Sequence, residues 1–558
     1  MSPREDAVQS TMQDVPLLIS RILTHGSTIH GSSQVITWTG EGEPHRRSFA
    51  EIGARAARLA HALRELGVEE GQPTGTLMWN NAEHVEAYFA IPSMGAVLHT
   101  LNLRQPPEQL AWIVNHAADR VVIANGSLLP LLAPLLPHLK SVEHVIVVGP
   151  GDRSLLDGAS VQVHEYEELI ADKPETYDWP ELDERQGAAM CYTSGTTGDP
   201  KGVVFSHRSV YLHSMQINMA QSMGLTDQDT SLVVVPQFHV NAWGVPHATF
   251  MTGVNMLMPD RFLQPGPLAE MIESAKPTHA AAVPTIWQGL LGELKAKPRD
   301  VSSLTQVTIG GSACPPALMK AFDELGMRVC HAWGMTETSP LGTIARPPAH
   351  VIGTDEEFAY RITQGRFPTS VEARLTGPGG ERLPWDGESA GELEVRGPWI
   401  AGAYYGGHGA TEVLRPADKF SEDGWLKTGD VGTISPDGFL TLTDRAKDVI
   451  KSGGEWISSV ELENALMAHP DVAEAAVVAV PDEKWGERPL ATVVLKEGAT
   501  ADFNTLRAFL ADEGRIAKWQ LPERWTVIET VPKTSVGKFD KKVLRRQYAA
   551  GDLDITQI

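Results

Sequence analysis

The chain has 558 residues, of which 42% are apolar and 21% charged. This is ordinary globular usage, so a disordered, collagen-like or coiled-coil protein is excluded, and the length predicts about three or four domains' worth of chain. Acidic residues number 70 against 47 lysines and arginines, a net charge of −23. Such a surface repels DNA and RNA, so we expect no nucleic-acid binding. Any anionic ligand must therefore meet a local cluster of cations.

The cysteines and the apolar stretches bear on location. Cys191, Cys314 and Cys330 are the only cysteines, and an odd count in so long a chain predicts neither a disulfide framework nor a cysteine-rich metal site. The N-terminus is polar and acidic, without the apolar core of a signal peptide. The most apolar stretch, around residues 128–139, contains three prolines and is well short of the ~20 residues of a membrane helix. We expect a cytoplasmic protein with no transmembrane segment.

The first part of the chain alternates helical patterns with short apolar runs. Helical periodicity covers residues 46–67, with Ser48 as the expected N-cap and Gly67 as the stop. Further helices are predicted over 82–93 and 107–115. Strands are predicted over 73–78, 120–123, 145–148, 190–192, 231–235, 254–258 and 307–309. This alternation predicts an α/β architecture with largely parallel sheets.

The pattern changes from about Val371. Strands are predicted over 372–375, 391–395 and 439–443, joined by Gly- and Pro-rich turns without clear helices between them. Beyond Arg445 a new unit begins, with helices over 459–467 and 506–512 and strands over 475–480 and 491–495. We expect a β-rich subdomain, followed by a small α+β domain of about a hundred residues.

One loop has the composition of a phosphate-binding segment. Tyr192-Thr-Ser-Gly-Thr-Thr-Gly-Asp-Pro-Lys201-Gly202 follows a predicted strand and contains three glycines, four Ser/Thr hydroxyls and a lysine. Glycines let backbone N–H groups approach an anion, hydroxyls donate to phosphate oxygens, and lysine supplies charge. On composition alone a surface turn is the commoner explanation. The loop is not a Walker A motif, because Lys201 is followed by Gly202 rather than by Ser or Thr.

The order of residues in this loop is more specific than its composition. Ser-Gly-Thr-Thr-Gly-x-Pro-Lys-Gly resembles the signature of the adenylate-forming superfamily, which includes the acyl-CoA synthetases. Further segments resemble those of the superfamily, in the same order along the chain. They are Pro236-Gln-Phe-His-Val-Asn-Ala-Trp243, Gly310-Gly-Ser-Ala313, Trp333-Gly-Met-Thr-Glu337-Thr338, Thr428-Gly-Asp430, Asp444-Arg-Ala-Lys447-Asp448, Lys451-Ser-Gly-Gly-Glu-Trp-Ile457 and Pro532-Lys-Thr-Ser-Val-Gly-Lys538. The resemblance therefore covers nearly the whole chain.

Three segments are most similar to those of medium- and long-chain fatty acyl-CoA synthetases, with methylmercaptopropionate-CoA ligase as a close relative. They are His-Val-Asn-Ala-Trp, Ser-Gly-Gly-Glu-Trp-Ile-Ser-Ser and Lys518-Trp-Gln-Leu-Pro522. Two departures are visible. Gln237 stands where relatives often carry Met, and Trp333 stands where many members have Tyr, although an indole can stack on adenine as a phenol ring does.

The resemblance implies a domain organisation. Residues 1–444 would form a large N-terminal adenylation domain of two α/β sheet subdomains plus the β-rich subdomain. Residues 445–447 would be a hinge, and residues 448–558 a small mobile α+β domain that turns between two half-reactions. It also favours a homodimer formed through the N-terminal domain.

The resemblance implies an AMP-forming acid–thiol ligase. A fatty acid would be activated by ATP to acyl-AMP with release of pyrophosphate, and coenzyme A would then take the acyl group and release AMP. The first alternative is a short-chain or methylmercaptopropionate-CoA ligase. The second is an adenylate-forming enzyme with another acceptor, such as a carrier protein or oxygen, and the third is a non-catalytic carboxylate or nucleotide sensor that retains the fold. The Gly-Gly-Glu-Trp loop favours free CoA.

The resemblance assigns catalytic roles to Lys538, Thr193, Lys201 and Glu337. Lys538 would be a mobile cation that reaches the α-phosphate and the substrate carboxylate. Glu337 and Thr193 would hold Mg²⁺, which proteins usually bind with one or two side chains plus substrate phosphates. On the residues alone, Glu337 is equally a helix cap and Lys538 is more often a solvated lysine. The resemblance to the family segments favours the functional roles.

Residues for ATP and CoA come from the same segments. Asp430 would accept from both ribose hydroxyls, although without the family context it is a turn aspartate. Arg445 would contact ribose or phosphate, or else be a solvated charge. The other nucleotide and CoA residues are Ser194, Gly195, Thr196, Thr197, Gly198, Gly311, Ser312, His331, Ala332, Trp333, Gly334, Thr336, Lys447, Lys451, Gly453, Gly454 and Trp456. Without the family context, a tryptophan such as Trp333 is more often a core residue. The junction around Lys447 would then be an ordinary linker.

The acid would bind beside His239, Val240 and Trp243. The Trp243 indole can close an acyl channel when no substrate is bound, or it can simply be core, the commoner fate of a tryptophan. His239 is expected to shape the pocket. His207 is not assigned to catalysis, because it is better placed to begin the helix that follows.

Overall fold

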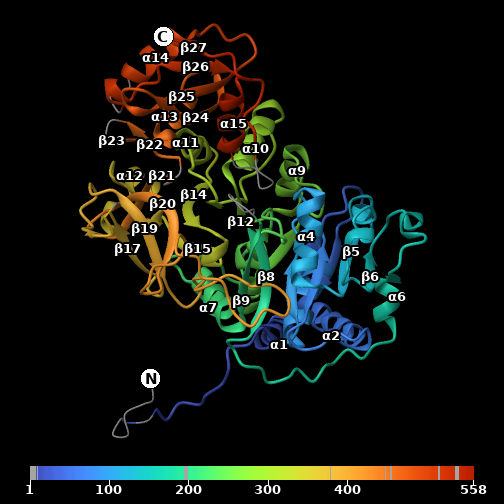
Figure 1. Cartoon of the computed structure of the whole chain (residues 1–558). Helices are drawn as coiled ribbons and strands as arrows, with labels where there is room; N and C mark the ends of the chain where they lie inside the picture. The colour runs from blue at the N-terminus through green and yellow to red at the C-terminus, as the bar shows by residue number, and fades with distance from the viewer. Residues whose placement is uncertain are drawn as a thin grey trace.

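Figure 1 shows the computed structural model of the chain. The structure describes residues 8, 10–193, 199–377, 379–445, 448–452, 455–512, 516–533 and 539–558, with the backbone alone at 444, 445, 451, 455, 456 and 512. The strands within these residues form three sheets. The α/β fold expected from the sequence, with a large N-terminal part and a small C-terminal part, is confirmed.

The first sheet has seven strands in the order β7-β6-β5-β3-β4-β8-β9. Its neighbours pair in parallel except β8 and β9, which form an antiparallel pair. The strands are β3 (Pro73–Leu77), β4 (Val97–Thr100), β5 (Val121–Asn125), β6 (His144–Val148), β7 (Gln162–Glu165), β8 (Gly187–Thr193) and β9 (Lys201–Ser206). The Gly-rich segment between β8 and β9 therefore starts at the carboxyl edge of this sheet.

Helices connect and cover these strands. They are α1 (Ile19–Ile29), α2 (Phe49–Glu65), α3 (Ala82–Ser93), α4 (Pro107–Ala117), α5 (Leu129–Leu132) and α6 (Tyr166–Ala171). Ser48 caps α2 as the sequence predicts: its hydroxyl accepts from the Glu51 N–H, and the Glu51 carboxylate accepts from the Ser48 N–H, a complete capping box.

The second sheet has fourteen strands in the order β18-β17-β19-β20-β21-β16-β15-β14-β13-β12-β10-β11-β1-β2. One half is α/β: β1 (Gln34–Thr37), β2 (His45–Ser48), β10 (Thr230–Leu232), β11 (Asn255–Met258), β12 (His279–Ala282), β13 (Gln306–Ile309) and β14 (Arg328–Gly334). Its helices are α7 (His207–Asn218), α8 (Val245–Thr252), α9 (Pro265–Ala275), α10 (Pro284–Ala296), α11 (Pro316–Glu324) and α12 (Glu357–Arg361).

The other half is the expected β-rich subdomain, and its strands pair antiparallel. They are β15 (Leu341–Ile344), β16 (Gly365–Arg366), β17 (Glu372–Thr376), β18 (Arg382–Leu383), β19 (Gly391–Arg396), β20 (Leu426–Ile434) and β21 (Phe439–Arg445). Strand β14 pairs in parallel with β13 and antiparallel with β15. The β-rich subdomain is therefore continuous with the α/β half through β14.

The C-terminal part forms the third sheet, β23-β22-β25-β26-β27, with β24 paired to β25. Its strands are β22 (Ile450–Ser452), β23 (Glu455–Ile457), β24 (Val472–Asp482), β25 (Gly486–Leu495), β26 (Arg524–Val527) and β27 (Thr556–Gln557), and its helices α13 (Ser459–Met467), α14 (Phe503–Asp512) and α15 (Lys541–Ala550). A separate apolar cluster around Trp525, Leu466 and Leu506 forms its core. In Figure 1 this part lies at one end of the molecule, above α11, α12 and β20.

One predicted strand is shorter than expected. Residues 231–235 are an apolar run, yet β10 ends at Leu232. The Asn80 amide donates to the carbonyls of Val233 and Val235, at 2.7 and 2.8 Å. A side chain thus takes acceptors that a longer strand would use, which apolar periodicity cannot reveal.

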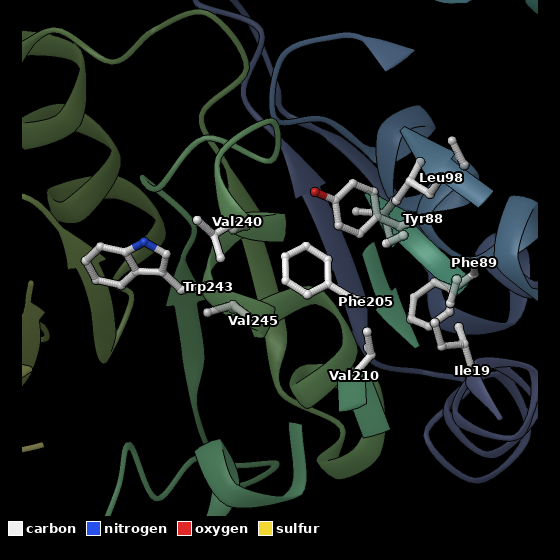
Figure 2. Close-up of a cluster of buried hydrophobic side chains, with 14 of the residues drawn as sticks. Ile19, Tyr88, Phe89, Leu98, Phe205, Val210, Val240, Trp243 and Val245 are labelled. Carbon is white, nitrogen blue, oxygen red and sulfur yellow. The ribbon is translucent and has the colours of Figure 1, made fainter. Parts of the chain in front are cut away.

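The largest core cluster joins the helices of the first sheet to the segment around Trp243. Figure 2 shows Tyr88, Phe89 and Ile19 on one side of Phe205, and Val240, Val245 and the Trp243 indole on the other. Phe49 and Phe250 stack at 3.9 Å between ring centroids within this cluster. Among the described helices, none has the length and apolar character needed to cross a bilayer.

Candidate active site

A cavity of about 690 Å³ opens between the second sheet and the C-terminal part, within the usual size of a small-molecule site. Residues at the carboxyl ends of β8, β13 and β14 line it, together with residues of β20. Ligand sites of α/β proteins gather at such strand ends. From the C-terminal part, α13 contributes Glu463, and Phe539 and Lys541 also line it.

Most described residues assigned from the sequence meet in this cavity. They are Thr193, Lys201, His239, Val240, Trp243, Gly311, Ser312, His331, Ala332, Trp333, Gly334, Thr336, Glu337 and Asp430. By backbone, Arg445 lies in β21, Lys451 in β22 and Trp456 in β23. The others lie outside the described residues: Ser194, Gly195, Thr196, Thr197, Gly198, Lys447, Gly453, Gly454 and Lys538. Thr193, Lys201 and Phe539, which flank two of these segments, line the cavity.

Two of the predicted nucleotide residues contact each other directly. The Trp333 Nε1–H donates to Asp430 Oδ2 at 2.8 Å, and both residues are buried. A Cβ on Gly342 would lie 2.2 Å from Trp333 Cζ3, so the indole packs on the backbone of β15. Asp430 is also fixed from its own strand, because its N–H donates to the Thr428 hydroxyl at 3.0 Å. The aromatic surface and the carboxylate are thus held in one fixed geometry.

His331 is a neutral, fully hydrogen-bonded part of the same wall. Its Nε2 accepts from the Cys314 N–H at 3.3 Å, and its Nδ1 lies 3.3 Å from the Ile362 carbonyl. Burial lowers the pKa of His331 to about 4, so the ring is neutral at pH 7, with its proton on Nδ1. His207 lies elsewhere: it is the first residue of α7, as expected. Its Nδ1 accepts from the Ile19 N–H at 3.3 Å.

A tyrosine that the sequence did not single out links the acidic and basic groups. The Tyr404 hydroxyl donates to Glu337 Oε1 at 2.7 Å, and Lys201 Nζ lies 5.1 Å from the centre of the Tyr404 ring, a cation–π distance. Burial raises the pKa of Tyr404 well above its usual value, so the hydroxyl remains a donor. Tyr404 follows a stretch without helix or strand periodicity, so no pattern marks it.

The donors present fit a magnesium ion shared with phosphates. Glu337 and Thr193 both line the cavity, one with a carboxylate and one with a hydroxyl. The described part of the chain holds no cluster of three or more His, Cys, Asp or Glu side chains arranged for a metal. One or two protein oxygens completed by substrate phosphates is the usual environment of Mg²⁺.

The segment before α8 has an unusual backbone. Val240, Asn241, Ala242 and Trp243 have φ between 47° and 55°, followed by Gly244 at 77°. This left-handed region is costly for residues with a Cβ, above all a β-branched one, and such strain concentrates at ligand sites. The turn brings the Trp243 indole against Gly310, where an added Cβ would lie 3.2 Å from Cη2. Trp243, which is 7% exposed, therefore both closes the core cluster and lines the cavity.

Lys541 is a second residue that the sequence did not single out. It is 9% exposed, and its Nζ lies 2.7 Å from Glu463 Oε1 and 2.6 Å from Ser459 Oγ. Spacing on α15 could not reveal this contact, because its partners lie on α13.

The sequence matches the AMP-binding enzyme family over residues 28–405 and the AMP-binding enzyme C-terminal domain over residues 461–538. The chain therefore belongs to the AMP-binding, adenylate-forming family.

Similar proteins narrow the class of enzyme to which the chain belongs. It is 44% identical over 537 residues to a 3-methylmercaptopropionyl-CoA ligase of Ruegeria pomeroyi, covering 96% of this chain and 97% of that one. It is 41% identical to a long-chain-fatty-acid–CoA ligase of Thermus thermophilus (98% of each) and 40% identical to a medium-chain-fatty-acid–CoA ligase of Ectopseudomonas oleovorans (96% of each). The crystal structure of ATP-bound MatB from Rhodopseudomonas palustris superposes with a TM-score of 0.80 at 25% identity, covering 96% of this chain and 99% of that one. The class of this chain is thus the AMP-forming acid–CoA ligases.

Proposed function

We propose that this protein activates a medium- or long-chain fatty acid with ATP and transfers the acyl group to coenzyme A. The observation that carries the proposal is one cavity lined by both polar and apolar side chains. The Trp333–Asp430 pair and the Glu337–Tyr404–Lys201 group supply polar groups suited to a nucleotide and its phosphates. Trp243 and other apolar residues of the lining supply surface suited to a hydrocarbon chain.

In the first half-reaction, an oxygen of the substrate carboxylate attacks the α-phosphorus of ATP, and pyrophosphate leaves. We assign the adenine wall to Trp333 and its neighbours, and the ribose hydroxyls to Asp430. Lys201 and Lys538 would neutralise charge at the phosphates; Phe539, next to Lys538, lines the cavity and supports this assignment. Glu337 and Thr193 would hold Mg²⁺, which when bound neutralises phosphate charge. Tyr404 keeps the Glu337 carboxylate oriented.

In the second half-reaction, the thiolate of coenzyme A attacks the acyl carbon, and AMP leaves. We assign the pantetheine path to Lys451, Gly453, Gly454 and Trp456, and the turning point to the hinge at residues 445–447, between domains 1–444 and 448–558. Support comes from the family match, and from α13 and Phe539 lining a cavity built mainly by the N-terminal part. The homodimer and the cytoplasmic location stay predictions from the sequence.

A second candidate substrate is methylmercaptopropionate. The 44% identity to a ligase of that name favours it, and its thioether chain would need a much smaller apolar surface. The two candidates share both half-reactions, so only the acid preference separates them.

The test is pyrophosphate release from ATP, measured with and without coenzyme A on a panel of straight-chain acids plus methylmercaptopropionate. We expect acid-dependent pyrophosphate release, turnover that requires coenzyme A, and an acyl-CoA product. Highest kcat/KM on methylmercaptopropionate would select the second candidate. Pyrophosphate release without formation of a CoA thioester would indicate that the acyl group passes to an acceptor other than CoA. No pyrophosphate release with any acid would overturn the proposal.

A further inference from the structure

Four further apolar side chains line the cavity together with Trp243. Ile217 and Met223 line it from α7 and the turn after it, and Leu341 and Ile344 line it from β15. Ile217 lies close to the Trp243 segment, since a Cβ on Gly244 would be 3.0 Å from Ile217 Cδ1. We place the acyl chain against these four side chains.

A tight turn after α7 forms part of this lining. Ser222 and Met223 line the cavity and are 1% and 6% exposed. The turn folds back on its own helix, because the N–H groups of Met223 and Gly224 both donate to the Ile217 carbonyl, at 3.0 and 3.3 Å. The Gln216 amide adds a bond to the Ser222 hydroxyl at 3.0 Å.

Two side chains from elsewhere in the sequence hold the turn from outside. Arg346, just after β15, donates through Nε to the Ser222 carbonyl at 2.9 Å and through Nη2 to the Met223 carbonyl at 3.3 Å. Arg346 Nη2 also donates to Gln306 Oε1 at 2.8 Å, and Gln306 Nε2 donates to the same Met223 carbonyl at 2.9 Å. Neither Arg346 nor Gln306 is among the described residues that line the cavity. Two carbonyls are thus fixed by a planar fork that only arginine offers.

We propose that Arg346 and Gln306 are specificity-determining positioning residues, which set the length of the accepted acid by locking the Ser222–Met223 turn as the floor of the acyl pocket. The inference rests on the proposed function and narrows it. Acids whose chain ends at this floor are preferred, so kcat/KM should be higher for medium-length acids than for long ones. Arg346 and Gln306 donate to the carbonyls of two neighbouring residues of the turn. The turn therefore cannot move aside for extra methylenes of the acid without breaking several hydrogen bonds at once. Packed walls of this kind shift between discrete arrangements rather than stretch.

The experiment compares Arg346→Ala, Arg346→Lys and Gln306→Met with the unmodified protein on a straight-chain acid series. For Arg346→Ala we expect the optimum to move to longer acids. The ratio of kcat/KM for an acid two methylenes past the original optimum, over the optimum itself, should rise about fifteenfold, since each methylene in apolar contact is worth about fourfold. Gln306→Met should shift the profile in the same direction by less. Lysine cannot form the planar fork, so Arg346→Lys should lie between the alanine variant and the unmodified protein.

Arg153→Ala is the matched control. Arg153 also holds two carbonyls of a turn, those of Gly149 and Gly151, at 2.8 and 3.1 Å, but this turn follows β6 in the first sheet. Its loss should therefore leave the length profile and the KM for ATP unchanged. If Arg346→Ala does not fold, Gln306→Met decides the question alone. A fall of equal factor on every acid with an unmoved optimum would make the pair merely structural and overturn the inference, while an unmodified protein that forms no acyl-CoA would overturn the proposed function and the inference with it.

Discussion

Trp333 has an additional role that its place in the family segment does not imply. Where many relatives have tyrosine, the indole N–H here reaches across to Asp430 at 2.8 Å, so the proposed adenine platform also orients the proposed ribose acceptor. A hydrogen bond to a charged acceptor is worth about 1.5–3 kcal/mol. The departure from the family pattern is therefore coupled to the orientation of the Asp430 carboxylate.

Replacing Trp333 by Phe keeps an aromatic face and removes the donor. We expect the KM for ATP to rise about tenfold or more, on the basis of that hydrogen-bond energy. The KM for 2′-deoxy-ATP should rise less, because a displaced Asp430 costs most where both hydroxyls are present. The control is Trp287→Phe, which removes an indole hydrogen bond to the Ala282 carbonyl in the core. If Trp333→Phe raises both KM values equally, the bond is structural only.

Trp243 occupies both the core and the cavity wall, so its substitution separates the two roles. We expect Trp243→Ala to remain folded and to change the chain-length profile more than the dependence on ATP. A purely structural tryptophan would cost ~3–5 kcal/mol and lower activity on every acid alike. Trp243→Gly is the companion variant: φ is 55° here, which glycine adopts without strain, so it should be more stable than the alanine variant. A uniform loss across the acid series, with a large drop in melting temperature, would place Trp243 in the core alone.

At the scale of elements, the boundaries follow local signals closely where such signals exist. Helices α3 and α13 begin and end as predicted, since each starts at an Asn or Ser whose side chain caps it. Helix α2 offers a direct test. Ser48→Ala should lower the free energy of unfolding by about 1 kcal/mol, measured by chemical denaturation, while the exposed Ser160→Ala should have little effect. Equal stability of the Ser48 variant and the original chain would mean that Glu51 and the flanking packing hold the helix start.

Other elements could not be predicted because distant parts of the chain determine them. The early end of β10 depends on Asn80, more than a hundred residues away. The left-handed run 240–243 contradicts local preference, since Val240 is β-branched, and only its surroundings hold it. For the site, motif order was enough to predict that the segments of Thr193, Trp243, Gly311, Trp333 and Asp430 meet in the cavity. The contacts of Tyr404, Lys541 and Arg346 carry no periodic or motif signal, so sequence reasoning missed them.

At the scale of the whole molecule, buried neutral histidines are spread through both large sheets and their helices. Burial lowers the pKa of each, to about 3 for His84 and His213 and to about 4 for the others. The others are His207, His247, His279 and His331. In the unfolded chain each would titrate near ~6.5. The folded state therefore binds fewer protons than the unfolded state in the pH window between these values.

The sign of the pH dependence follows from that difference. A group whose pKa is lower in the folded state stabilises the fold above its unfolded pKa, and this contribution is lost as the pH falls. Below pH ~6.5, each such histidine should lower the free energy of unfolding by about 1.4 kcal/mol per pH unit. The melting temperature should therefore fall steeply from pH 7 to about 5, before most carboxylates titrate. His279→Gln is the control: it removes one buried titrating ring, held at 3.0 Å by Ser231 and 3.2 Å by Thr308. It should lower stability at pH 7 yet make the fall with pH shallower. A melting temperature that stays flat over this range, or a slope unchanged in His279→Gln, would mean that these rings are protonated within the folded protein.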